Sequence, residues 1–79
     1  METMRIEFDF SKLRGRIVER FGNNANFCDV VGMSVQRLSA RLNNRAQFQP
    51  VEIKLFCKPE YLDIADSEIP AYFFAPKVR

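Results

Sequence analysis

The sequence predicts a mostly α-helical domain, a compact bundle of four to five short helices that contains a helix-turn-helix. Three observations support this prediction. Apolar residues recur every three or four positions, capping residues and glycines divide the chain into short segments, and 79 residues suffice for only one small core. We therefore expect one helix-turn-helix DNA-binding domain, 1–79, with 1–10 as an N-terminal arm or strand and 71–79 as a C-terminal tail or strand.

The first helix is expected from Ser11 to Phe21, because its apolar residues fall on one face and basic residues on the other. Asp9 or Ser11 can accept a hydrogen bond from a free N–H at its start, and Gly22 supplies a left-handed residue at its end. The apolar positions are Leu13, Ile17, Val18 and Phe21.

Two further helices follow within the next two dozen residues. Asn23 is a good cap for a helix over Asn24–Val31, and Ser34 for a helix over Val35–Asn43. The side chains expected to face the core are Phe27, Val30, Val31, Leu38 and Leu42. Asn43 and Asn44 favour a left-handed exit from the last of these helices.

The second half of the chain predicts less regular structure. Phe48 anchors a loop, and a helix starts at Pro50 and ends near Lys58, because Pro59 cannot continue it. Asp66 can cap a final turn through Ile69. Alternating apolar residues over Met4–Phe10 and the aromatic-rich segment Ala71–Val78 predict short terminal strands, although the first of these could also be an extended arm.

The helices 24–31 and 35–43 are separated only by Gly32, Met33 and Ser34, which is the spacing of a helix-turn-helix. Cys28 is small enough for a close helix crossing, and Gly32 allows the positive φ of a tight turn. A plain helical hairpin would show the same apolar pattern. On the helix 35–43, the face opposite the two leucines combines an amide, guanidinium groups, a hydroxyl and a methyl, which are groups that read base edges.

The basic residues are concentrated in the first half of the chain. Residues 12–45 carry seven basic side chains and two acidic ones, a net charge of +5, whereas residues 46–76 carry −3. The basic residues are Lys12, Arg14, Arg16, Arg20, Arg37, Arg41 and Arg45. This asymmetry predicts a face for an anion, and a solvated surface of mixed charge is the alternative.

Several classes of function are disfavoured by composition. The chain has no histidine, the commonest general base and metal ligand, and two cysteines too far apart for a CxxC motif. We expect no enzymatic activity, metal, cofactor or small-molecule ligand. No apolar run is long enough to span a membrane and the first ten residues do not resemble a signal peptide, so we expect a cytoplasmic protein with reduced cysteines.

The segments FDFSKLRGRIVERFG, NFCDVVGMSVQRLSARLN and IPAYFF resemble small phage repressors of the Cro and CI type, within the lambda-repressor-like helix-turn-helix family. The resemblance implies a bundle of five helices that binds operator DNA, usually as a dimer. It also implies that Asn24 supports a phosphate contact and that Asn43 holds the DNA backbone. The chain departs from the family at Cys28, where alanine is usual, and at Pro59, which interrupts the fourth helix.

We therefore predict a phage or prophage transcriptional regulator that binds double-stranded operator DNA through Val35–Asn43. The residues predicted to read bases are Val35, Gln36, Arg37, Ser39 and Ala40. Those predicted to contact phosphates are Asn24, Ser34, Arg41, Asn43, Asn44 and Arg45. The alternative is a module of the same shape that binds another protein, such as an antitoxin or an antirepressor.

A homodimer is expected, at least on DNA, because one recognition helix reads only a few base pairs. Tyr72, Phe73 and Phe74 cannot all enter one small core, so this segment is the first candidate for the dimer contact. The segment Met4–Phe10 is the second candidate, and it could also pair with the C-terminal segment of its own chain.

Overall fold

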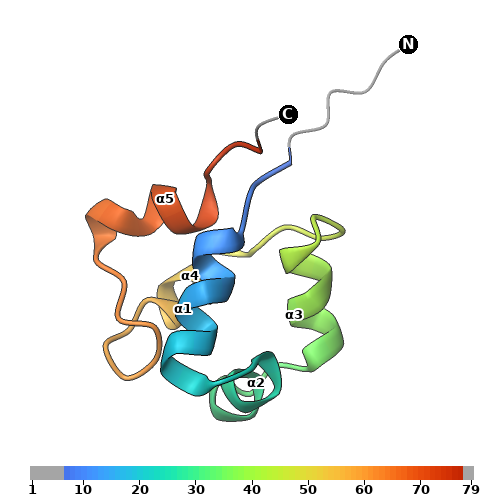
Figure 1. Ribbon diagram of the computed structural model, residues 1–79, viewed down its shortest axis with the longest axis vertical. Coiled ribbons are helices and arrows are strands. Elements are labelled where there is room, and N and C mark those ends of the chain that lie inside the picture. The colour runs from blue at the N-terminus through green and yellow to red at the C-terminus, as the bar shows by residue number, and fades with distance from the viewer. Residues whose placement is uncertain (1–6, 78–79) are drawn as a thin grey trace.

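The computed structural model describes residues 7–77, and helices dominate this range. Its elements in chain order are α1 (Ser11–Phe21), α2 (Asn24–Val31), α3 (Val35–Leu42), α4 (Pro50–Phe56), a 3-10 turn (Asp66–Glu68) and α5 (Ile69–Phe73). In Figure 1, α1 runs through the middle, α2 lies at its end, α3 stands to one side and α5 lies on the other. The predicted helical bundle is confirmed. None of the helices described is long and apolar enough to cross a membrane.

The starts of α2 and α3 are fixed by side-chain caps, both at the predicted residues. The side chain of Asn23 accepts a hydrogen bond from the Asn26 N–H at 2.8 Å, and the Ser34 hydroxyl accepts one from the Arg37 N–H at 3.1 Å. At the start of α1, the Asp9 carboxylate accepts from both the N–H and the hydroxyl of Ser11. These hydrogen bonds lower the pKa of Asp9.

The core is apolar and rich in aromatic rings. Its buried members are Phe10, Leu13, Ile17, Phe27, Cys28, Leu38, Leu42, Phe56, Leu62, Ile64, Tyr72 and Phe73. Phe48 is half-buried and packs against this cluster, with its ring centroid 5.2–5.8 Å from those of Phe10, Phe56 and Phe73, so its predicted role as a loop anchor is confirmed.

Two residues predicted to face the core do not. Val18 is 55% exposed and Val30 is 52% exposed. Each lies next to a residue that does fill the apolar face of its helix, Ile17 in α1 and Val31 in α2. Neighbouring residues on a helix are rotated by about 100° from each other, so Val18 and Val30 lie at the edge of the buried face. Helical spacing of apolar residues therefore predicts a wider buried face than the helices have.

The predicted terminal strands are wrong over the residues that the structure describes. Residues 69–73 are helical, since Pro70 is well suited to a first helical turn. The end of α4 also differs from the prediction, because this helix ends at Phe56 and not near Lys58. The β pairing between residues 7 and 77 is a single antiparallel bridge, Phe8 with Pro76, flanked by the hydrogen bonds Asp9 N–H to Ala75 O and Lys77 N–H to Glu7 O. Residues 7–9 and 75–77 therefore lie side by side, as in Figure 1, and form no sheet among the residues described. Residues 4–6 of the predicted first strand lie outside the described range.

Two glycines give a matched test of backbone conformation. Gly32 has φ +79°, which favours glycine, whereas Gly15 lies inside α1, and a Cβ at either position would meet no atom within 4 Å. We expect Gly32→Ala to lower the free energy of unfolding by about 1 kcal/mol and Gly15→Ala to raise it by about 0.5–1 kcal/mol. Urea unfolding of both variants would measure this. Equal effects would show that the turn after α2 does not require a left-handed residue.

Candidate functional site

Helices α2 and α3 form the predicted helix-turn-helix, and the turn is held by the backbone. Gly32 ends α2 in the left-handed conformation, and the N–H groups of Gly32 and Met33 both donate to the carbonyl of Cys28. Cys28 is almost completely buried where the two helices meet, as predicted, and its burial raises the pKa of the thiol. Leu38 and Leu42 fasten α3 to the core, so the opposite face of α3 points outward.

This outward face contains the residues predicted to read bases. Val35, Gln36 and Arg37 are exposed, whereas Ser39 and Ala40 are half-buried. The face carries no acidic residue of its own, but Arg37 lies 3.6 Å from the carboxylate of Glu52 in α4. It therefore offers an amide, a guanidinium group and an exposed valine side by side.

Arg41 cannot serve as the predicted phosphate ligand, because it is buried. Its Nε lies 2.7 Å from Glu52 Oε1, and only 7% of the residue is exposed. Arg41 lies one turn after Arg37, and α4 begins beside this turn, so α4 covers Arg41 and supplies its counter-charge. Sequence reasoning missed Glu52, and the signal available was a glutamate three residues after Gln49 at a helix start that has Pro50.

Glu52 is a buried carboxylate with a lowered pKa. Burial by itself raises the pKa of this group. The hydrogen bonds from Arg41 and from the Gln49 N–H, together with the charges of Arg41 and Arg37, outweigh burial and hold the pKa below its usual value. Glu52 therefore joins the start of α4 to the second half of α3.

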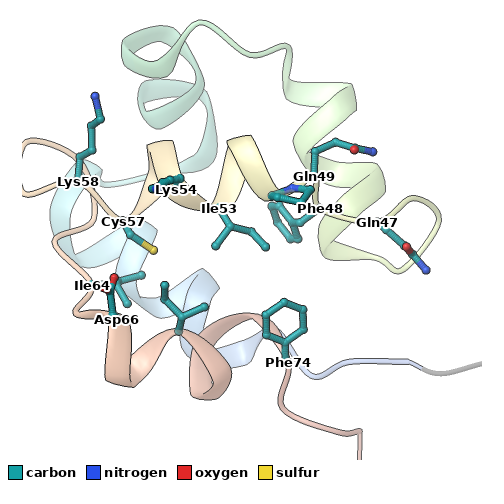
Figure 2. A pocket seen from close by; sticks show the side chains of 12 residues that line it. Gln47, Phe48, Gln49, Ile53, Lys54, Cys57, Lys58, Ile64, Asp66 and Phe74 are labelled. Atoms are coloured by element: carbon teal, nitrogen blue, oxygen red, sulfur yellow. The ribbon is translucent and has the colours of Figure 1, made fainter.

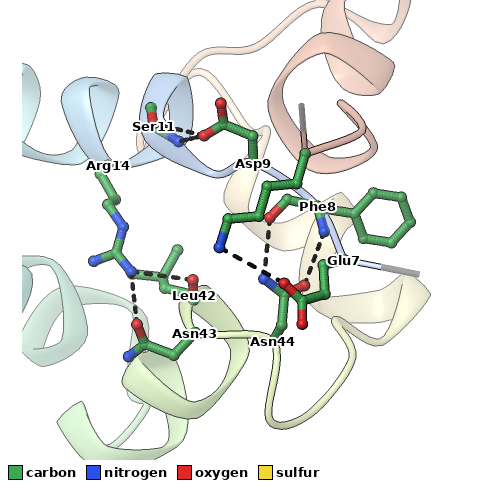
Figure 3. A network of polar contacts seen from close by, with 9 residues as sticks. Glu7, Phe8, Asp9, Ser11, Arg14, Leu42, Asn43 and Asn44 are labelled. Carbon is green, nitrogen blue, oxygen red and sulfur yellow. Dashed lines mark hydrogen bonds and ion pairs between the residues drawn. The ribbon is translucent and has the colours of Figure 1, made fainter. Parts of the chain in front are cut away.

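The two asparagines after α3 also bind within the chain (Figure 3). The Asn43 oxygen accepts from Arg14 at 3.1 Å, and its amide donates to the carbonyl of Ser39 at 2.9 Å. Asn44 adopts the predicted left-handed conformation, with φ 62°, and its side chain bonds both the N–H and the carbonyl of Phe8. The predicted role of Asn44 as a phosphate ligand does not fit this clamp on the N-terminal arm. Of the other predicted phosphate ligands, Ser34 and Arg45 are exposed and Asn24 is half-buried.

The three arginines of α1 all donate hydrogen bonds to backbone carbonyls of other segments. Arg14 donates to the carbonyl of Leu42, Arg16 to those of Leu62 and Asp63, and Arg20 to those of Pro59 and Tyr61. These contacts join α1 to the end of α3 and to the segment after α4. The charge asymmetry of the sequence therefore serves internal bridging to a large extent.

Comparison with known proteins gives two findings. A family model described as "Protein of unknown function (DUF739)" matches residues 6–76. The solution structure of the modulator of repression (MOR) of the temperate bacteriophage TP901-1 from Lactococcus lactis is similar, with a TM-score of 0.74 and 33% sequence identity, over 91% of this chain and 95% of that chain. No curated protein matches the sequence. Similarity to a phage regulatory protein is thereby confirmed, whereas the closer assignment to the Cro and CI type stays a prediction.

Proposed function

The chain belongs to the DUF739 family, and we propose that it is a phage or prophage regulator that modulates repression by binding a protein through the outward face of α3. The target class is a repressor protein. The proposal is supported by the similarity to a phage modulator of repression and by the chemistry of the helix-turn-helix surface.

The observation that carries the proposal is the internal use of the arginines. Most DNA-binding affinity comes from neutralising phosphates with Lys and Arg side chains. Most of the basic side chains between residues 12 and 45 are already bound to carbonyls or carboxylates of the chain itself. They are Arg14, Arg16, Arg20 and Arg41.

The outward face also has the composition of a protein interface. Val35 is 47% exposed, and Val30 of α2 is exposed as well. Protein interfaces favour arginine and apolar residues at their centre and are poor in lysine and acidic residues. Val35, Gln36 and Arg37 fit this pattern, with the exposed apolar surface providing the favourable burial.

Sequence-specific DNA binding is the second candidate, and the lack of acidic residues on α3 favours it. Gln36 and Arg37 could pair with adenine and guanine in the major groove, and Arg45 lies free of ion pairs within residues 7–77 just beyond the helix. If the chain binds DNA, we expect a homodimer on two DNA half-sites about 34 Å apart, with Phe74 at the contact between protomers.

One set of measurements separates the two candidates. We expect the purified chain to bind the repressor from the same phage or prophage genome and to relieve repression of a reporter. Fluorescence anisotropy should show no binding to operator or random duplex DNA at low salt. The double change Gln36→Ala with Arg37→Ala should weaken repressor binding by about tenfold or more. The control is Val18→Ser, which changes an exposed residue of α1, away from α3.

Salt-dependent binding to operator DNA, with no affinity for the repressor, would contradict the proposal and establish the second candidate. In that case Arg45→Ala should reduce the slope of log affinity against log salt by about 1, equally for all sequences.

A further inference from the structure

Residues 7–9, which we call the strap, lie between the end of α3 and the C-terminal tail. On the α3 side, the side chain of Asn44 accepts a hydrogen bond from the Phe8 N–H and donates one to the Phe8 carbonyl, both at 3.0 Å. Figure 3 shows this amide closing onto the strap. One donor and one acceptor are what a neighbouring strand would offer to Phe8, so Asn44 takes the place of a strand on this edge.

On its other side the strap is bonded to the tail, residues 75–77. The Asp9 N–H donates to the Ala75 carbonyl at 2.8 Å. The Lys77 N–H donates to the Glu7 carbonyl at 3.1 Å, and the side chains of the same two residues form an ion pair at 3.7 Å. The strap is therefore the middle member of a ladder that runs from the end of α3 to the tail.

The tail leads away from α3. It follows Phe74, whose ring packs on that of Phe8 with the two centroids 5.7 Å apart. Figure 2 shows Phe74 and Ile53 of α4 on opposite sides of an apolar pocket of about 620 Å³, which is lined by residues between Gln47 and Phe74. The strap thus joins the end of α3 to the region of α4 and α5.

The end of α3 needs support because the helix is short. It has eight residues, whereas isolated helices shorter than about 12–15 residues are marginal in water. Its start is held by the turn at Gly32, and its last turn by Arg14 of α1, which donates to the Leu42 carbonyl at 3.0 Å. Asn44 fixes the chain two residues further on, in a left-handed conformation that asparagine tolerates better than most residues.

Glu52 connects the last turn of α3 to its outward face. Its carboxylate lies 2.7 Å from Nε of Arg41, in the last turn, and 3.6 Å from the guanidinium of Arg37, on the outward face. Unwinding of the last turn would separate Arg41 from Glu52 and remove the buried cation that holds this carboxylate beside Arg37. Order at the end of α3 therefore affects the position of Arg37.

We propose that Asn44 is a positioning residue for the outward face of α3 and that, through the strap, this face depends on the C-terminal tail. When either link of the ladder is broken, the end of α3 is ordered in a smaller fraction of molecules, and the apparent affinity for a partner falls with that fraction. Neither Asn44 nor the tail contacts the partner. The link from the tail to α3 is a property of the chain alone, whereas the effect on affinity rests on the proposed function.

Amide hydrogen exchange of the ¹⁵N-labelled protein tests the first link. Asn44→Gly removes the amide and keeps a residue that readily adopts positive φ. The Asn43 and Arg45 amides, which donate to carbonyls of α3, should lose most of their protection and exchange at least about tenfold faster. The amide of Gly32, which donates to the carbonyl of Cys28 in α2, is the internal reference and should stay within about twofold of the wild type.

Two variants of Lys77 test the second link. Lys77→Pro removes both the ion pair with Glu7 and the N–H that bonds its carbonyl, whereas Lys77→Ala removes the ion pair and keeps that N–H. Lys77→Pro should speed exchange of the Arg45 amide by about threefold, and Lys77→Ala should leave it unchanged. Added to Asn44→Gly, Lys77→Pro should have no further effect at Arg45, because the link is already broken.

Binding to the repressor from the same genome gives the functional readout. Asn44→Gly should weaken it by about threefold or more and Lys77→Pro by a smaller factor, because each lowers the fraction of molecules with an ordered α3. Lys77→Ala should bind as the wild type does.

Faster exchange confined to the strap and the tail would overturn the proposal. Equal acceleration at Gly32 would also overturn it, because it would show only a loss of global stability. So would unchanged repressor affinity in Asn44→Gly. If the wild type binds no repressor, the proposed function fails, while exchange at Arg45 still decides whether the strap acts on α3.

Discussion

Replacing Glu52 with glutamine is expected to lower the free energy of unfolding by about 3–5 kcal/mol, because it leaves the buried guanidinium of Arg41 without a counter-charge. The glutamine keeps the shape of the side chain, so the loss reports charge and hydrogen bonding instead of packing. The same carboxylate also accepts the N–H of Gln49 at the start of α4. Chemical denaturation followed by circular dichroism would measure the loss.

The matched control is Glu19→Gln, which removes an exposed carboxylate paired with Arg16 at 3.2 Å. Exposed pairs contribute about 0–1 kcal/mol, so this variant should stay close to the wild type. Similar losses in both variants would contradict a special role for the Glu52–Arg41 pair.

The pH dependence gives an independent test of the same pair. The pKa of Glu52 is lower in the folded protein than its usual value of 4.5. The unfolded chain therefore binds the proton more readily, and the stability that Glu52 contributes is present above pH 4.5 and is lost as the pH falls below it. The wild type should lose more stability than Glu52→Gln between pH 6 and pH 3, and parallel curves would contradict this.

The helix-turn-helix was predictable because its determinants are local in sequence. Asn23 and Ser34 cap helices within three residues of themselves, and Gly32 acts through its own φ. Such signals do not depend on the rest of the fold. For this reason α2 begins and ends at the predicted residues and α3 begins at the predicted residue, as does α1.

The binding partners of the arginines were not predictable, because they lie in segments that are distant in the sequence. Arg41 meets Glu52 eleven residues later, and Arg16 meets carbonyls 46 and 47 residues later. A guanidinium that binds the chain and one that binds phosphate look alike in sequence, since both need only a basic residue on a helix. The four-residue spacing of Arg37, Arg41 and Arg45 is that of one helix face, but this spacing cannot show that α4 covers Arg41.

The C-terminal segment shows how local signals compete. Tyr72, Phe73 and Phe74 have high strand propensity, whereas Pro70 favours the first turn of a helix. The helix forms because it buries Tyr72 and Phe73 against the core and leaves Phe74 exposed, which confirms that the three rings cannot all face inward.

The second large effect is expected at Phe27, where Phe27→Ala should lower the free energy of unfolding by about 3–5 kcal/mol. Phe27 of α2 is completely buried, and its ring centroid lies 5.1 Å from that of Phe21 and 4.8 Å from that of Phe56. Truncation removes both aromatic contacts and leaves a cavity where α1, α2 and α4 meet. A domain of this length has a total stability of about 4–12 kcal/mol, so the variant should be close to unfolding at room temperature.

Phe74→Ala is the matched control, because Phe74 is half exposed and makes a single ring contact, with Phe8 at 5.7 Å. We expect this variant to lose about 1 kcal/mol or less, so thermal unfolding should separate the two clearly. Phe27→Leu, which keeps much of the volume, should fall between them. If Phe27→Ala were as stable as Phe74→Ala, the side chains of α1, α2 and α4 would have to repack to fill the cavity. This result would contradict a rigidly packed core beneath the helix-turn-helix.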